Sequence, residues 1–194
     1  EKASGVLADK TPANMILLRG FSSIPSIPSM QSIYQLNPIA IAAYPMYRGL
    51  ARLAGMEVLP TGLSLGEEIT TLENAFGGHD FFFLHVKGAD SAGEDADFER
   101  KVSVIEEVDR FIPRILALKP DVLVIAGDHS TPAVIGGHSW HPVPLLLHSS
   151  YCRPDNTLSF SETSCLSGGL GTIPATSIMP LAMANAQKLG KYGA

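Results

Sequence analysis

Carboxylates and imidazoles, the side chains that most often bind divalent metal ions, gather in three short segments of this sequence. The first segment holds Asp90 and Glu94, which are four positions apart. A helical turn between them would present both carboxylates to one ion. Acidic residues are also common at the start of a helix, because they complement the helix dipole. Taken alone, this segment is open to either interpretation.

The second segment places Asp128 and His129 directly after the apolar run of residues 122–125. One carboxylate and one imidazole form a mix of ligands that suits Zn or Mn. For an isolated pair, a turn capped by the aspartate with a hydrogen-bonded histidine is an equally good alternative.

The third segment begins with the paired glycines Gly136 and Gly137, followed by His138 and, three positions later, His141. Glycine lets the backbone approach a site closely. A lone histidine is more often structural than functional. Two histidines here, with His129 upstream, favour a functional site.

The elements that must position these residues alternate between short apolar runs and helical patterns. The runs predict strands at residues 15–19, 39–44, 56–60, 81–86, 122–126 and 143–147. Such runs, bounded by turn residues, are typical of strands buried on both faces. All three polar segments follow or adjoin predicted strands, and in parallel sheets functional groups collect at the carboxyl ends of the strands.

Helices are expected between the strands. Apolar residues at spacings of three and four predict a long helix over residues 96–118, capped by Asp95 or Asp97 and kinked or shortened by Pro113. Shorter helices are expected at residues 46–54, 67–76 and 179–189. The alternation predicts an α/β fold with a largely parallel sheet. Residues 20–38, rich in Ser and Pro, are expected to form a linker or a crossing between domains.

Once these elements are in place, the motifs resemble a known family. Gly127–Pro132 reads Gly-Asp-His-Ser-Thr-Pro, and His138-Ser139 and Pro142-Val143-Pro144 follow. This string is similar to that of the archaeal-type, bisphosphoglycerate-independent (cofactor-independent) phosphoglycerate mutases, which belong to the alkaline phosphatase superfamily. Supporting matches run through the chain, at residues 14–20, 49–52, 55–56, 85–87, 165–171 and 192–194.

The resemblance implies an activity and a set of ligands. The family interconverts 3-phosphoglycerate and 2-phosphoglycerate, a step of glycolysis, through a phosphoserine intermediate and with two divalent ions, usually Mn or Zn; Mg is a further possibility here. By resemblance, Asp90, the residue at position 94 and His138 hold one ion, while Asp128 and His129 contribute to the other. Substrate would be bound by three basic residues: Arg19, Arg48 and Lys87.

Two departures from the family pattern matter. Position 94 is Glu94 where the family has His, and Arg48 stands where the family usually has Lys. More importantly, nothing in the chain matches the family's Asp-Gly strand or its nucleophilic serine. The resemblance thus implies an incomplete phosphatase-like domain: residues 1–30 as the end of an inserted domain and its linker, and residues 31–194 as the carboxy-terminal, metal-binding part. The missing segment would lie upstream, and the first residue, Glu1, is not Met.

Composition limits the other function classes. Hydrophobic residues make up 45% of the 194 positions and the net charge is −5, with the basic residues scattered, which argues against nucleic acid as a partner. Apolar runs end well before the about 18 residues of a membrane span, and no signal peptide is visible. Cys152 and Cys165 form no disulfide framework, so a reducing, cytoplasmic setting is expected.

Two alternatives to the mutase remain. Glu94 and Arg48 favour a phosphatase or phosphomutase of the same superfamily that acts on another phosphorylated small molecule. The absent nucleophile favours a catalytically silent metal-binding module.

Overall fold

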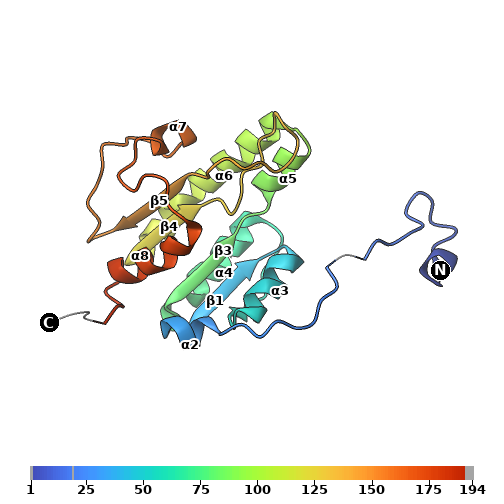
Figure 1. The fold of residues 1–194 in the computed structure, drawn as a ribbon, viewed down its shortest axis with the longest axis horizontal. Coiled ribbons are helices and arrows are strands. Elements are labelled where there is room, and N and C mark those ends of the chain that lie inside the picture. Colours follow the sequence, from blue (N-terminus) through green and yellow to red (C-terminus); the bar gives the residue numbers. More distant parts are fainter. Residues whose placement is uncertain (1, 19, 191–194) are drawn as a thin grey trace.

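The computed structural model describes residues 2–18 and 20–190, which form an α/β arrangement built around a small parallel sheet (Figure 1). The elements, in chain order, are α1 (Lys2–Val6), α2 (Met30–Tyr34), β1 (Pro38–Ala42), α3 (Pro45–Leu53), β2 (Glu57–Val58), α4 (Leu65–Ala75), the 3-10 turn η1 (Phe76–Gly78), β3 (Phe81–His85), α5 (Gly88–Glu94), α6 (Phe98–Ala117), β4 (Val122–Ala126), β5 (Leu145–Ser149), α7 (Glu162–Cys165), η2 (Ala175–Ser177) and α8 (Ile178–Asn185). The predicted fold class, a parallel sheet with flanking helices, is confirmed.

The parallel sheet has the strand order β2-β1-β3, with β1 in the centre. Ile39 pairs in register with Phe82, and Ala42 pairs with His85, so β1 and β3 end side by side. Every residue of β1 is buried. Ile39 and Ile41 pack against Leu72 of α4, and side chains of α6 cover the same cluster.

Local sequence explains the helices that cover this sheet. α3 begins with Pro45, whose missing N–H costs nothing in the first turn of a helix. α4 begins with a capping box: the Ser64 hydroxyl accepts from the Glu67 N–H, and the Glu67 carboxylate accepts from the Ser64 N–H. For α6, Asp97 is the cap, and Pro113 lies inside the helix without ending it.

The last two strands differ from the expectation of one sheet. β4 and β5 pair with each other, antiparallel, in a separate two-stranded sheet. A parallel pair needs a crossover connection, usually a helix, and residues 127–144 between the two strands contain none. The side chains of β4 are only partly buried.

The strand predicted at residues 15–19 is wrong for the residues that the structure describes. Residues 14–18 pair with no described strand, and Met15 and Leu17 are exposed. An apolar run forms a stable strand only where a partner supplies its hydrogen bonds. In Figure 1 this segment runs away from the sheets toward α1, a helix with no buried residue. Among the described residues, no helix has the length and apolar character needed to cross a lipid bilayer.

Candidate metal centre

The candidate ligands lie on two segments that follow strands: a helix after β3 and a loop after β4. β3 ends at His85 and leads into α5, which carries Asp90 in its first turn and Glu94 as its last residue. β4 ends at Ala126 and leads into the loop with Asp128 and His129. The predicted helical turn between the two carboxylates is therefore confirmed, and this helix contacts the loop that follows β4 of the other sheet.

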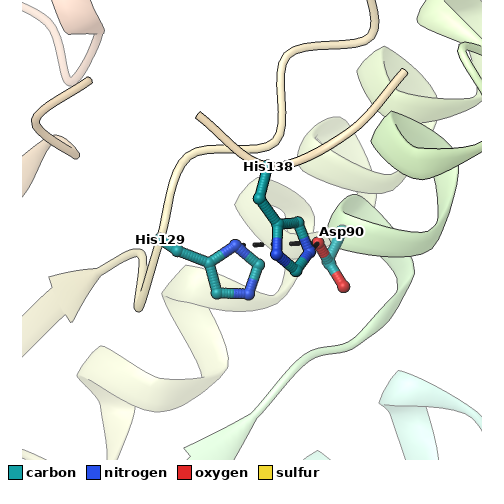
Figure 2. Close-up of side chains that lie close together, drawn as sticks. All are labelled: Asp90, His129 and His138. Atoms are coloured by element: carbon teal, nitrogen blue, oxygen red, sulfur yellow. Dashed lines mark ion pairs between the residues drawn. The ribbon is translucent and has the colours of Figure 1, made fainter. Parts of the chain in front are cut away.

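Asp90, His129 and His138 come together, each offering one ligand atom within 4.8 Å of the others. Figure 2 shows Asp90 approaching from α5 and both imidazoles approaching from the loop region that follows β4. Asp90 Oδ1 lies 3.4 Å from His138 Nε2 and 3.8 Å from His129 Nδ1. The two imidazole centroids are 4.0 Å apart.

A short backbone bridge brings His138 back beside His129. The Ser139 N–H donates to the Ser130 carbonyl at 2.9 Å, so the chain reverses between these two residues. Gly136 adopts a positive φ of 66° in that reversal, a conformation that favours glycine. The paired glycines thus help place a histidine, as the sequence indicated.

Glu94 joins the side of the site formed by Asp90 and His138. Its Oε1 lies 3.5 Å from His138 Nε2. Lys87 forms an ion pair with Asp90 and lies 3.6 Å from Glu94 Oε2. Burial alone would raise the pKa of Asp90, but hydrogen bonds from Lys87 and Thr131 outweigh it, and the pKa is lowered. Asp90 is therefore held in the charged form that a cation requires.

Asp128 lies on the other side of His129. Its Oδ2 is 3.5 Å from His129 Nε2, and its Oδ1 accepts from the His129 N–H at 3.0 Å. The Tyr47 hydroxyl donates to Oδ2. Burial, followed by this hydrogen bond to Asp128, raises the pKa of Tyr47 to about 12, so the hydroxyl stays protonated as a donor.

Tyr47 ties three elements together. It lies in the first turn of α3, directly after β1, and its ring stacks on that of His85 at 3.6 Å between centroids. His85 Nδ1 is buried without a partner among the described residues, and burial lowers the pKa of this histidine, which favours its neutral form. Tyr47 was not identified from the sequence, because an aromatic residue at the start of a helix gives no local sign of a partner 81 positions away.

Thr131 was also missed. Its hydroxyl donates to Asp90 Oδ1 at 2.6 Å and lies 3.0 Å from His129 Nδ1. The residue belongs to the motif that carried the family resemblance, and its place two positions after a candidate ligand is the signal that could have found it.

The three basic residues predicted to bind substrate differ in their relation to the cluster of candidate ligands. Lys87 lies within it and forms an ion pair with Asp90. Arg48 lies on α3, one position after Tyr47, partly buried and in no ion pair with the described residues. Arg19 lies outside the described residues. His141 is hydrogen-bonded to Ser139 rather than to the cluster, with 2.9 Å between Nδ1 and Oγ.

The donor set fits divalent metal ions. Nitrogen and oxygen ligands bound at about 2.0–2.2 Å to one tetrahedral ion lie ~3.4 Å from each other. Two separations match this value: 3.4 Å from His138 Nε2 to Asp90 Oδ1, and 3.5 Å from His129 Nε2 to Asp128 Oδ2. Imidazole and carboxylate together suit Zn or Mn.

An α/β domain with histidines and carboxylates clustered after its strands has the character of a metalloenzyme. The chain belongs to the Metalloenzyme superfamily, whose family model matches residues 6–185. It is similar to proteins named probable 2,3-bisphosphoglycerate-independent phosphoglycerate mutase, with 55% identity over 193 residues in Thermotoga neapolitana and 51% over 195 residues in Aquifex aeolicus. Each match covers 100% of this chain and 48% of the relative. The chain thus spans about half the length of these curated relatives, and the family inferred from the motifs is confirmed.

Solved structures agree with this membership. The PH0037 protein of Pyrococcus horikoshii matches with a TM-score of 0.86 and 32% identity, over 91% of this chain and 57% of that one. The cofactor-independent phosphoglycerate mutase of Thermoplasma acidophilum matches with a TM-score of 0.66 and 25% identity, over 84% of this chain and 40% of the other.

Proposed function

We propose that this chain is the metal-binding half of a 2,3-bisphosphoglycerate-independent phosphoglycerate mutase, which interconverts 3-phosphoglycerate and 2-phosphoglycerate through a phosphoserine. One observation carries the proposal: ligand atoms of Asp90 on α5 and of His129 and His138 on the segment after β4 lie within 4.8 Å of one another. The relatives that match the whole chain bear this enzyme's name. The proposed setting is the cytoplasm.

The five candidate ligands divide into two groups in the proposed enzyme. Asp90, Glu94 and His138 hold one divalent ion, and Asp128 and His129 contribute to a second, both Mn or Zn, with Mg as a further choice. The separations within each group, 3.4–3.5 Å between ligand atoms, support this division. When bound, the ions polarise the phosphoryl group and lower the pKa of the attacking serine.

The basic residues neutralise the substrate in this proposal. Phosphoglycerate carries a phosphate and a carboxylate, and the fork of an Arg side chain binds either group with two hydrogen bonds. Arg19 and Arg48 supply such forks. Lys87 holds Asp90 in place before substrate arrives and adds positive charge at the centre.

The nucleophilic serine belongs, in this proposal, to an upstream segment of the same protein, and residues 1–30 are the end of a domain inserted between that segment and residues 31–194. The length of the relatives supports this, because the chain covers 48% of them. So do the strands beside the site: the apolar side chains of β3 and β4 are only partly buried, and further chain packed on them would remove that surface from water.

The test is the full-length gene product loaded with Mn or Zn and assayed for interconversion of the two phosphoglycerates. We expect turnover, its loss in His138→Ala, and its retention in the matched control His148→Ala, because His148 is an exposed residue of β5 away from the cluster. The 194-residue chain alone should have little or no activity. Absence of turnover in the metal-loaded full-length protein, or robust turnover by the chain alone, would contradict the proposal.

A second candidate keeps the site and changes the substrate. Glu94 adds negative charge where the resembled family has His, and Arg48 replaces a Lys, and both changes would suit a different phosphorylated small molecule as substrate. A panel of sugar phosphates, assayed beside the phosphoglycerates, separates the two. A silent metal-binding module would bind Mn or Zn and turn over neither.

A further inference from the structure

The hydroxyl of Thr131 lies between a candidate ligand of each ion. It donates to Asp90 Oδ1 at 2.6 Å and lies 3.0 Å from His129 Nδ1. The side chain is almost wholly buried, with 4% of the residue exposed. Because so little of the residue is exposed, Asp90 and His129 are the partners for its hydrogen and lone pairs.

The single hydroxyl hydrogen decides where the proton of His129 sits. An ionised carboxylate can only accept, so the hydrogen of Thr131 goes to Asp90. The oxygen can then only accept from His129, which requires the imidazole proton to be on Nδ1. A neutral imidazole has one proton, so Nε2 carries the free lone pair that a metal needs.

The direction of that lone pair assigns His129 to one side of the site. Nδ1 is the atom near Asp90, at 3.8 Å, and it is occupied by its proton. Nε2 is the atom near Asp128, 3.5 Å from Oδ2. His129 can therefore share an ion with Asp128 through Nε2, while Asp90 is left to pair with His138.

We propose that Thr131 is a positioning residue that fixes His129 as the Nδ1–H tautomer and thereby directs its Nε2 to the ion held by Asp128. The inference rests on the proposed function, in which these residues bind metal. Partners of this kind orient metal-binding histidines, and removing one typically costs about 10–100-fold in metal affinity.

The packing around Thr131 holds the hydroxyl where this role needs it. Lys101 of α6 donates through Nζ to the Thr131 carbonyl at 2.5 Å. Gly93 of α5 is buried against the same carbonyl oxygen, and a Cβ at that position would overlap it. The absence of a side chain at Gly93 therefore lets α5, with Asp90, approach the loop closely enough for the 2.6 Å hydrogen bond.

The direct test is the tautomer of His129 in the metal-free full-length protein, labelled with ¹⁵N at its histidines, at an alkaline pH where imidazoles are neutral. Long-range ¹H–¹⁵N correlation spectra distinguish the two tautomers, and the His129 signals are assigned by their absence in His129→Gln. We expect the Nδ1–H tautomer in the unmutated protein, a shift toward Nε2–H in Thr131→Val, and recovery of Nδ1–H in Thr131→Ser. Valine keeps the volume of threonine and removes only the hydroxyl, and serine keeps the hydroxyl.

A second measurement follows the consequence for metal. Titration with Mn should show affinity lowered by about 10–100-fold in Thr131→Val and largely restored in Thr131→Ser. The matched control is Thr71→Val, because Thr71 also makes two hydrogen bonds, at 2.9 and 3.1 Å, but lies on α4 away from the ligands. It should leave both the tautomer and the Mn affinity unchanged.

The outcomes separate this inference from the proposed function. If His129 is Nε2–H in the unmutated protein, the proposed role of Thr131 is wrong. It is also wrong if Thr131→Val changes neither the tautomer nor the Mn affinity. If the unmutated full-length protein binds no Mn or Zn, the proposed function fails. The tautomers of the three Thr131 proteins still show whether Thr131 orients His129.

Discussion

The central strand of the parallel sheet, β1, and the first strand of the antiparallel pair, β4, are both apolar but differ in how deeply they are buried. β1 has a strand on each edge and helices packed against it, and all five of its residues are buried. β4 has one partner strand among the described residues, and none of its side chains is buried. The candidate ligands divide along the same line: Asp90 is carried by α5, which follows β3 of the parallel sheet, whereas Asp128, His129 and His138 come from the segment between β4 and β5.

Three side chains join these two regions at the site. Tyr47 reaches Asp128 from α3, Thr131 reaches Asp90 from the loop after β4, and Lys101 reaches the Thr131 carbonyl from α6. The metal centre therefore depends on hydrogen bonds across the boundary as well as on its ligands.

The largest effect is expected from emptying the core of the parallel sheet. Ile41 is completely buried, so Ile41→Ala should lower the free energy of unfolding by about 2–5 kcal/mol, the usual cost of lost burial and a cavity. Ile125→Ala, in partly buried β4, should lower the free energy of unfolding clearly less, because the Ile125 side chain is already partly exposed to solvent. Urea unfolding of the two variants measures both. Equal losses would show that the two regions are equally well packed.

A smaller effect is expected from Glu68, a buried carboxyl that accepts from the Ala43 N–H at the end of β1. Burial raises its pKa from the ordinary value of 4.5 to about 7, so the folded chain binds more protons than the unfolded chain between these values. Stability should therefore fall as pH rises through this window, by up to ~3 kcal/mol. Unfolding experiments on either side of it should show the slope, and Glu68→Gln should flatten it. An unchanged slope in Glu68→Gln would assign the effect to other groups.

The smallest of these effects is expected at the boundary itself. Tyr47→Phe removes the hydroxyl that holds Asp128 and keeps the ring that stacks on His85. Affinity for Mn should fall by about 10-fold or somewhat more, in the range typical of residues that orient ligands, with little change in the urea midpoint. Tyr34→Phe, in the core cluster formed around Met30, is the control and should leave Mn affinity unchanged. Equal Mn affinity in the two variants would mean that the hydrogen bond from Tyr47 of α3 does not position Asp128 for metal binding.

Much of the fold follows from patterns within single segments. The apolar runs of β1, β3 and β4, the periodicity of α6 and its Asp97 cap all rest on neighbours a few positions away, and all were predictable. The prediction of a strand at residues 15–19 was wrong for the described residues, and β4 and β5 form a separate sheet instead of joining the parallel one. Strand pairing depends on distant partners that periodicity does not reveal.

The sequence by itself determined the chemistry of the site: two carboxylates one helical turn apart, an Asp-His pair after a strand, and a histidine after paired glycines. Only the tertiary structure decided which of these atoms face each other, and it added Tyr47 and Thr131. Those two hydrogen bonds join residues 81 and 41 positions apart. These hydrogen bonds depend on how α3, α5 and the loop after β4 pack together. The same packing directs the hydroxyl hydrogen of Thr131 to Asp90.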